Sequence, residues 1–276
     1  MPESERMEES MKILHISDIH YREGYEPCEK GYKAVLYRMQ SPLEPLGHCL
    51  AQAREAYPDL DCLLISGDLT EDGTAEDYAQ LRQFIEDQVG GLPVVVTLGN
   101  HDNKASFYQG WLGQAPSSEP YNCVAHFGDT AIISWDTSVQ GNPDGIITSQ
   151  QMQWLKDAFA QNQDRHIILM THHHFMEHQA SVPAIPNQKE FPELLRDHQI
   201  DCLLCGHTHH KFAYFYGDVP YYTVDGMSFY ADLLMNGAVR FRETYGYNYY
   251  KIDDGMVSEH RTATFNTGKV LDTMFW

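Results

Sequence analysis

The chain has 276 residues, and its apolar fraction of 42% is enough for one sizeable core. With 39 acidic and 19 basic residues, its formal net charge of -20 argues against polymeric nucleic acid and anionic membrane surfaces as partners, because both need clustered lysine and arginine. Six scattered cysteines, a polar start and the lack of a long apolar run indicate a cytoplasmic protein. We expect residues 1–10 to be a disordered tail and residues 11–276 to form a single domain.

In the first half of the chain, apolar segments alternate with helical patterns. Buried strands are expected at 12–16, 62–65 and 93–98. Between the first two strands we expect a helix in two pieces around Pro42 and Pro45. Between the second and third strands, Thr74 is expected to cap a helix that ends at Gly90-Gly91.

The second half contains more strands and fewer helices. We expect a short helix at 103–113, a hairpin of 121–126 and 130–135, a helix capped by Ser149, a strand at 166–170, a helix at 190–198 and a strand at 201–205. Residues 211–276 are expected to be strand-rich, with strands at 213–216, 221–224, 247–252 and 256–261. Two interpretations of this region stay open, a cap over the site and a homodimer interface. The order of elements predicts mixed sheets with helices outside.

Five of the expected strands run directly into residues that bind metal ions or move protons. These segments are Ser17-Asp18-Ile19-His20, Ser66-Gly67-Asp68, Gly99-Asn100-His101-Asp102, Thr171-His172-His173-His174 and Gly206-His207-Thr208-His209. Sites in such folds form beyond the carboxyl ends of the strands, so we expect the five segments to meet there. In Asp18-x-His20 and His207-x-His209, the two-residue step points both side chains the same way.

The types of donor indicate a metal centre. Carboxylate, imidazole and amide donors without thiolates suit manganese, iron or zinc. Seven donors are too many for one ion and suit two, and the two ions of a phosphoester site lie roughly 3.5 to 4 Å apart and share a carboxylate. Asp68, at the end of its strand, is our choice for the shared ligand. The candidate metal ligands are Asp18, His20, Asp68, Asn100, His172, His207 and His209.

A pair of ions predicts both a substrate class and a mechanism. Two divalent ions, two carboxylates and one hydroxide leave about one positive charge, which favours an anionic phosphoester. The ions lower the pKa of water from about 15.7 toward neutrality, so a hydroxide that bridges them can attack phosphorus. His101 and Asp102 are the catalytic candidates. His101 would hydrogen-bond to the phosphoryl oxygen or protonate the leaving group, and Asp102, Glu71 or Asp72 would fix its tautomer.

The five segments, in this order, resemble the pattern of the calcineurin-like metallophosphoesterase family, D-x-H, G-D, G-N-H-D/E, H and G-H-x-H, from about residue 12 to residue 209. The chain is most similar to class III cyclic nucleotide phosphodiesterases and the related glycerophosphodiesterases. The resemblance implies a four-layer αββα sandwich of two mixed sheets flanked by helices, with His101 in contact with the substrate. It also implies one metal ion on Asp18, His20, Asp68 and His209, and another on Asp68, Asn100, His172 and His207.

Some assignments near the site have alternatives. The family usually shows His-His-Pro where this chain has His172-His173-His174-Phe175, so the ligand is one of three histidines. His172 is our choice because it follows the strand at the family's distance. As substrate ligands we consider Asn100, His101, Arg22 and His173. The alternatives are a surface arginine for Arg22 and a solvated loop histidine for His173.

Together these patterns predict a hydrolase for a small phosphodiester, with a cyclic nucleotide as the favoured substrate. A phosphomonoesterase or a glycerophosphodiesterase on the same centre is the first alternative. The second is a catalytically idle protein that binds metal and nucleotide, and the complete ligand set argues against it.

Overall fold

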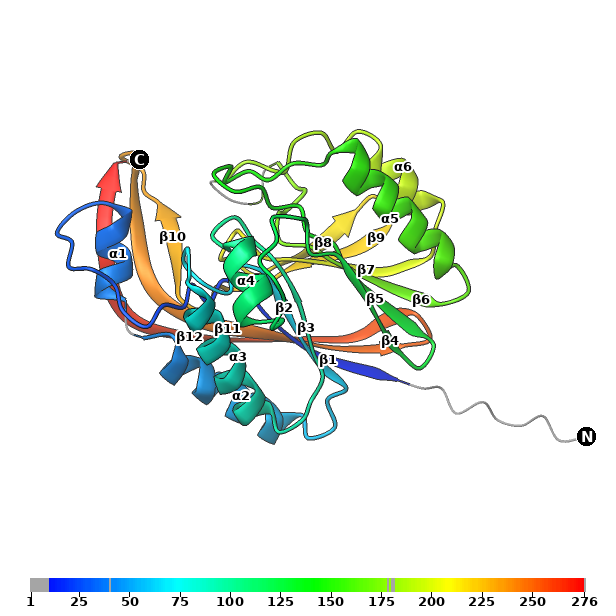
Figure 1. The fold of residues 1–276 in the computed structure, drawn as a ribbon, viewed down its shortest axis with the longest axis horizontal. Helices are drawn as coiled ribbons and strands as arrows, with labels where there is room; N and C mark the ends of the chain where they lie inside the picture. Colours follow the sequence, from blue (N-terminus) through cyan, green and yellow to red (C-terminus); the bar gives the residue numbers. More distant parts are fainter. Residues whose placement is uncertain (1–9, 40, 178, 180–181, 276) are drawn as a thin grey trace, which may run out of the picture.

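The computed structural model describes residues 10–39, 41–177, 179 and 182–275, and Figure 1 shows their arrangement. Two six-stranded mixed β-sheets lie face to face, and helices cover the outer face of each sheet. The predicted four-layer αββα sandwich is therefore confirmed. Residues 1–9 of the expected disordered tail lie outside the described residues.

The first sheet combines strands from the two ends of the chain. Its parallel part consists of β1 (Met11–Ile16), β2 (Cys62–Ser66) and β3 (Val94–Thr97). Its antiparallel part consists of β10 (Phe229–Leu233), β11 (Ala238–Asp253) and β12 (Met256–Phe275). β11 pairs with β1, so the C-terminal region is an integral part of this sheet.

The second sheet has the strand order β4-β5-β6-β7-β9-β8. Its strands are β4 (Cys123–Phe127), β5 (Thr130–Ser134), β6 (His166–Met170), β7 (Ile200–Cys205), β8 (Phe212–Tyr216) and β9 (Val219–Thr223). The four central strands are parallel, and β4 and β8 form antiparallel edges. Every residue of β7 is buried, as expected for a strand covered on both faces.

Five helices form the two outer layers. The helices α2 (Leu43–Ala56), α3 (Ala75–Val89) and α4 (Lys104–Gly110) pack on the first sheet, and α5 (Ser149–Gln161) and α6 (Phe191–Arg196) pack on the second. Figure 1 shows α2 and α3 on the opposite side of the sandwich from α5 and α6. Among the described residues, no helix combines the length and the apolar character that a membrane span requires.

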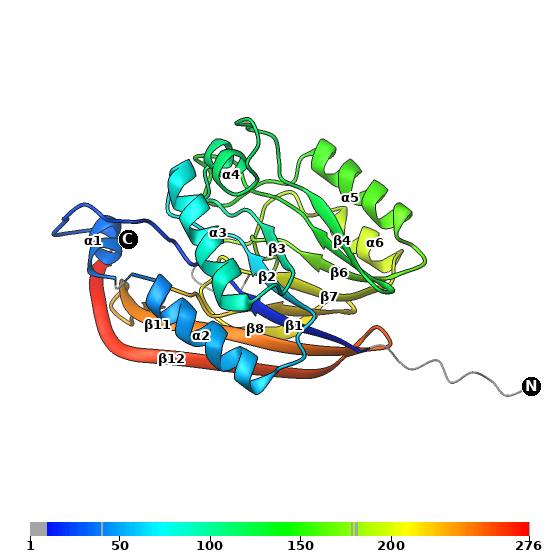
Figure 2. The ribbon, with the colours of Figure 1, turned by 60° about the horizontal axis from the view of Figure 1, so that its bottom comes forward.

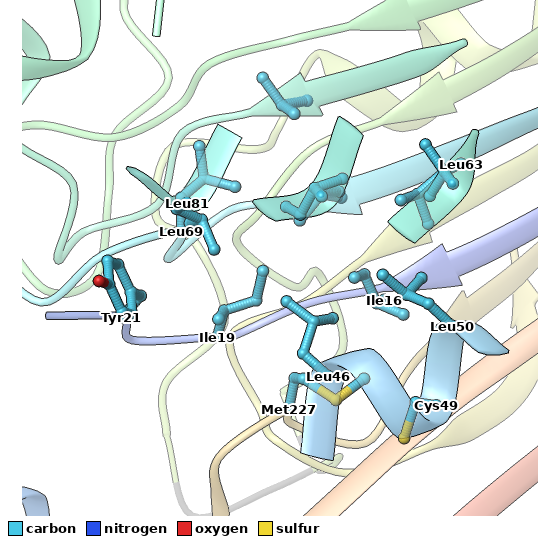
Figure 3. Close-up of a cluster of buried hydrophobic side chains, with 14 of the residues drawn as sticks. Ile16, Ile19, Tyr21, Leu46, Cys49, Leu50, Leu63, Leu69, Leu81 and Met227 are labelled. Carbon is cyan, nitrogen blue, oxygen red and sulfur yellow. The ribbon is translucent and has the colours of Figure 1, made fainter. Parts of the chain in front are cut away.

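Three buried clusters hold these layers together. Ile16, Leu46 and Leu81 belong to the cluster between the first sheet and its helices, which Figure 3 shows in detail. Leu64 of β2 and Leu204 of β7 belong to the core between the two sheets. A third cluster joins the second sheet to α5 and α6. The four-layer order therefore follows from strands that are apolar on both faces and helices that are apolar on one.

Helix caps confirm one prediction and correct another. Thr74 caps α3 as predicted, because its hydroxyl accepts from the N–H of Asp77 and the Asp77 carboxylate accepts from the N–H of Thr74. The prediction that Ser149 caps α5 is wrong. Thr148 occupies that position, and it exchanges the same pair of hydrogen bonds with Gln151, which leaves Ser149 as the first helical residue.

The C-terminal strands are longer than predicted, and they curl around the short helix α1 (Tyr32–Arg38). The expected strand at 247–252 is the centre of β11, the expected strand at 256–261 is the start of β12, and β10 was not expected. Val35 and Leu36 of α1 pack against Phe229, Phe241 and other apolar residues of the three strands. Figures 1 and 2 both show α1 beside the curled end of β12.

One buried carboxylate predicts how stability depends on pH. Asp201 is 3% exposed, and Nδ1 of His166 lies 3.5 Å from its Oδ1 without a hydrogen bond between them. Burial raises the pKa of Asp201 to about 6, above the value of about 3.9 in an unfolded chain. The native state therefore loses stability as the pH rises from about 4 through about 6. We expect Asp201→Asn to raise the free energy of unfolding by about 1 to 3 kcal/mol at pH 8, with a smaller gain at pH 4.

Urea titrations at the two pH values measure this difference. Asp164→Asn is the control, because it removes an exposed carboxylate and should leave the free energy of unfolding nearly unchanged. A gain that is equal at both pH values, or a loss at pH 8, would show that the charge of Asp201 is not the cause.

Candidate metal centre

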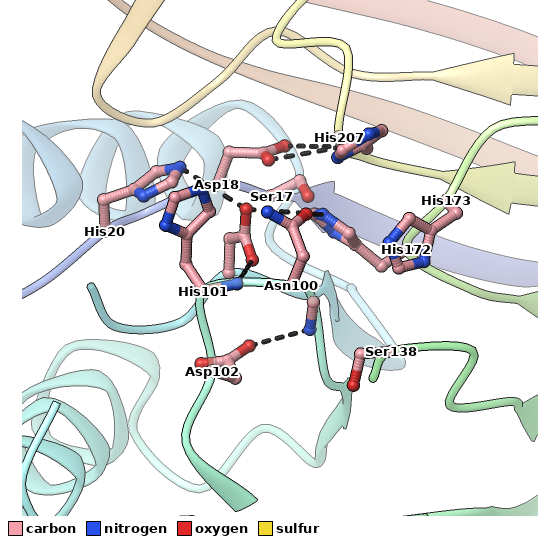
Figure 4. Close-up of polar contacts among 12 residues, drawn as sticks. Ser17, Asp18, His20, Asn100, His101, Asp102, Ser138, His172, His173 and His207 are labelled. Atoms are coloured by element: carbon pink, nitrogen blue, oxygen red, sulfur yellow. Dashed lines mark hydrogen bonds and ion pairs between the residues drawn. The ribbon is translucent and has the colours of Figure 1, made fainter. Parts of the chain in front are cut away.

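The five polar segments that follow strands meet at one edge of the sandwich. Figure 4 shows side chains from four of them. They follow the carboxyl ends of β1, β2 and β3 in the first sheet and of β6 and β7 in the second. The structure brings together all seven residues that we expected to bind metal. The seven are Asp18, His20, Asp68, Asn100, His172, His207 and His209.

Four of these side chains form one tight group. Ligand atoms of Asp18, His20, Asp68 and His209 all lie within 4.8 Å of one another. Nε2 of His209 is 3.2 Å from Nε2 of His20 and 3.3 Å from Oδ1 of Asp18. Oδ2 of Asp68 is 3.6 Å from Nε2 of His20. This is the set that the family resemblance assigns to one metal ion.

Asp68 also contacts the second predicted set. Its Oδ2 is 3.3 Å from Nε2 of His172, and the same nitrogen is 3.2 Å from Oδ1 of Asn100. The ring of His207 lies 5.0 Å from the ring of His172, measured between centroids. The backbone N–H of His207 donates to the Asp18 carboxylate at 3.2 Å, which links the two sets. Of the three consecutive histidines, His172 is the one that faces Asp68.

The hydrogen bonds of the imidazoles show that the histidines fit metal ions. Nδ1 of His172 donates to the carbonyl of Ser66 at 2.7 Å, and Nδ1 of His209 donates to the carbonyl of Phe229 at 2.6 Å. Nδ1 of His20 lies 2.7 Å from a carboxylate oxygen of Glu71. A carbonyl only accepts, so each neutral ring keeps the lone pair of Nε2 for the centre of the cluster. Histidine ligands of metal ions are held in this way.

The backbone around the cluster is strained. Asp18, His20, Asp68, His207 and His209 have φ angles of 56°, 51°, 48°, 67° and 53°. These values lie in the left-handed region, which residues with a Cβ seldom adopt. Strain of this kind persists where the surrounding structure enforces it, and it is concentrated at functional sites.

Glycines allow the segments to approach this closely. A Cβ at Gly67 would lie 2.5 Å from Nδ1 of His172. A Cβ at Gly99 would collide with the Asp68 carboxylate, and one at Gly206 would collide with the Ser17 hydroxyl. The glycines that precede the ligands in three of the five segments are therefore required by packing.

The pKa values in the cluster show that positive charge beside Asp68 stabilises its buried carboxylate. Burial alone would raise the pKa of Asp68, but the positive charges of His172 and His101 hold it well below its ordinary value. Burial would lower the pKa of His172, but Asp68 raises it to about 9. Burial and the neighbouring histidines hold the pKa of His207 well below its ordinary value. A metal ion bound beside Asp68 would supply the positive charge that the protonated imidazoles supply here, with the same side chains as its ligands.

Glu71, not Asp102, orients His101. Oε1 of Glu71 lies 2.9 Å from Nδ1 of His101, while its Oε2 contacts His20. Asp102 instead accepts from the N–H groups of Gly99, Leu69 and Thr70 at 2.9 to 3.2 Å and from the Tyr78 hydroxyl at 2.8 Å. The expectation that Asp102 acts with His101 is therefore not supported by its contacts. Its carboxylate is used to hold two loops together.

Two of the four candidate substrate ligands, His173 and Arg22, occupy different surroundings. His173 is buried, with Nδ1 2.8 Å from the Thr137 hydroxyl and its ring 4.9 Å from the ring of His207. The alternative of a solvated loop histidine is therefore wrong. Arg22 lies close enough to Asp77 and Tyr25 for its charge to act on both. Contact of either residue with substrate stays a prediction.

Aromatic side chains beside the cluster were not predicted as part of the site. The ring of Phe229 stacks on His209 with 4.4 Å between centroids. Its neighbour Ser228 donates to the carbonyl of Asp18 at 2.7 Å. Tyr32 of α1 lies 5.7 Å from His101, ring to ring. The sequence carries only a general signal for these contacts, the aromatic richness of the C-terminal region.

The model of the calcineurin-like phosphoesterase family matches residues 11–211. This chain belongs to that family. The family consists of phosphoesterases, so this chain is a hydrolase. The match covers all five segments that carry predicted ligands. Residues beyond 211, which supply β10, β11 and β12, lie outside the match.

Curated relatives of this phosphoesterase are phosphodiesterases for small substrates. A cAMP/cGMP dual specificity phosphodiesterase of Mycobacterium tuberculosis is 28% identical over 84% of this chain and 72% of its own length. A 3′,5′-cyclic adenosine monophosphate phosphodiesterase of Escherichia coli is 26% identical over 74% of this chain and 71% of its own. A glycerophosphodiester phosphodiesterase of Enterobacter lignolyticus is 26% identical over 72% of this chain and 71% of its own length.

Solved structures share the fold of this phosphoesterase at low sequence identity. A purple acid phosphatase from yellow lupin seeds has a TM-score of 0.54 at 13% identity, over 95% of this chain and 55% of its own. A putative 5′-nucleotidase from Staphylococcus aureus has a TM-score of 0.53 at 14% identity, over 94% of this chain and 54% of its own length. These likenesses support the fold alone.

The contacts of Asp102 predict that its loss affects stability more than metal binding. Asp102→Asn keeps the size of the side chain but loses acceptors that buried N–H groups require. We expect a decrease of about 1 to 3 kcal/mol in the free energy of unfolding, with unchanged metal content in the folded protein. Urea titration and elemental analysis measure the two quantities.

Asp68→Asn is the matched control, because it removes one charge from a carboxylate that faces the histidines. We expect this variant to lose bound metal. Loss of metal at full stability in Asp102→Asn would place Asp102 among the ligands and contradict our interpretation.

Proposed function

We propose that this phosphoesterase hydrolyses a small phosphodiester with two metal ions, and that a cyclic nucleotide is its favoured substrate. One observation carries the proposal: the Asp68 carboxylate contacts histidine Nε2 atoms of both predicted ligand sets. Two ions that share a carboxylate are typical of phosphoester hydrolysis. Curated relatives with cyclic nucleotide or glycerophosphodiester substrates support the phosphodiester class.

The residues divide into two ligand sets with one shared member. Asp18, His20 and His209 would hold one ion, Asn100, His172 and His207 the other, and Asp68 both. Manganese, iron or zinc suits these oxygen and nitrogen donors. When bound, such ions lower the pKa of water to supply the nucleophile, and they stabilise the charge of the phosphoryl group.

His101 is the residue that we assign to the substrate. Its side chain is 28% exposed, whereas the side chains of His20 and His172 are 1% and 0% exposed. Glu71 holds Nδ1, so Nε2 is free to donate to a phosphoryl oxygen or to the departing alkoxide. The N–H of His101 also donates to Oδ1 of Asp68 at 2.9 Å, which ties its position to the shared ligand.

The acidic composition supports a small substrate. With 39 acidic and 19 basic residues, the net charge of the chain opposes binding of polymeric nucleic acid, which requires clustered lysine and arginine. The phosphomonoesterase and glycerophosphodiesterase alternatives use the same ligands, so the substrate has to be tested directly. A homodimer formed through residues 211–276 is a further prediction.

The first test removes and restores metal. Chelated protein is expected to be inactive toward bis(nitrophenyl) phosphate and to regain turnover when Mn²⁺ is added, with about two ions bound per chain. Nitrophenyl phosphate, assayed beside the diester, separates a monoesterase from a diesterase. Cyclic AMP and glycerophosphocholine then separate the two diester classes. Two bound ions without turnover of any substrate would instead favour the idle binding protein.

Two variants test the assigned roles. Asp68→Ala should lose both metal and turnover, because both ligand sets depend on this carboxylate. His101→Ala should retain metal but lower kcat by about 10² to 10⁴, the range for a group that transfers a proton or stabilises charge. Metal analysis and steady-state kinetics check both. Unchanged diester hydrolysis in the two variants would refute the mechanism.

A further inference from the structure

Glu71 is contacted by three side chains from three parts of the chain. Its Oε1 lies 2.9 Å from His101, and its Oε2 lies 2.7 Å from His20. The hydroxyl of Tyr32 donates to the same Oε2 at 3.1 Å. Glu71 is 8% exposed, so water is a poor substitute for any of these partners.

Tyr32 is fixed by its own small apolar core. The ring packs against the cluster formed by α1 and the curled C-terminal strands, with centroids 6.0 Å from Phe229 and 6.4 Å from Phe241. Arg38, at the other end of α1, contacts Asp272 and the carbonyl of Leu271 at 3.0 Å each. These contacts hold the tyrosine hydroxyl against Glu71.

We propose that Tyr32 is a positioning residue of the active site, which acts through Glu71 on His20 and His101 together. The inference rests on the proposed function for its kinetic part, but its effect on metal binding is independent of turnover. The Tyr32 hydroxyl supplies the third contact of a buried carboxylate and so limits the orientations that the carboxylate can adopt. Without the Tyr32 hydroxyl, the carboxylate that contacts both His20 and His101 is held less firmly.

Tyr32→Phe tests this role, because it removes the hydroxyl and keeps the ring. Tyr21→Phe is the matched control. Tyr21 is buried where Tyr32 is half-buried, and its hydroxyl donates to Gln80 at 2.8 Å instead of to Glu71. We expect Tyr32→Phe to weaken Mn²⁺ binding and to lower kcat by roughly three- to tenfold each, with KM changed by less than about twofold. Tyr21→Phe should change none of these quantities.

Combination with Glu71→Gln shows whether Tyr32 acts through Glu71. In the Glu71→Gln background, Tyr32→Phe should have almost no further effect on Mn²⁺ binding or kcat, because the side chain through which it acts is already altered. Fully multiplicative effects would overturn the proposal. So would wild-type Mn²⁺ binding in Tyr32→Phe, or a loss that Tyr21→Phe shares.

The two proposals fail in distinguishable ways. If the wild-type protein binds Mn²⁺ but hydrolyses no phosphoester, the proposed function fails, and Mn²⁺ titration of the variants still decides the role of Tyr32. If the wild type is active and Tyr32→Phe matches it in both Mn²⁺ affinity and kcat, only the inference about Tyr32 fails.

Discussion

The carboxylate of Asp68 joins the two predicted ligand sets of the candidate metal centre. It follows β2 in the first sheet, yet it contacts His172 from the second sheet as well as His20 from the first. A buried carboxylate without nearby positive charge would be costly, so its position requires the imidazoles around it or the ions that they hold. The four-layer fold satisfies this requirement by placing the carboxyl ends of five strands at one edge.

The close approach of the five segments strains the backbone. Five of the seven predicted ligands adopt left-handed φ angles, and glycines 67, 99 and 206 occupy places where a Cβ would collide with a neighbour. A conformation that costs of order 1 to 3 kcal/mol per residue needs a rigid surrounding, and the two buried sheets provide it. The strained backbone depends on the buried core, because loops on a less tightly packed core would relax from the geometry that two ions would need.

The sequence predicted the parts of this arrangement that follow local rules. Apolar runs ending in polar residues located five of the parallel strands, and their shared orientation placed the ligands at one edge. Contacts between residues far apart in the chain could not be predicted as well from the sequence. Asp102 was named with His101 as a catalytic candidate, and Glu71 and Asp72 were alternatives for orienting His101. The structure shows Glu71 beside His101. Most of β12 after residue 261 is exposed and gives little alternation of buried apolar residues, so its length was missed.

The ligands and the surrounding aromatic side chains have separate roles. A cyclic nucleotide and a glycerophosphodiester would present the same phosphodiester group to the predicted ligands, so the ligands alone would not distinguish them. Discrimination has to come from groups around the phosphorus. On the side of His20, His101 and His209, the structure places Tyr32 of α1 and Phe229 of β10 beside the predicted ligands. Tyr32 lies within the segment that matches the family model and Phe229 lies beyond it, so the aromatic side chains beside the ligands come from both parts of the chain.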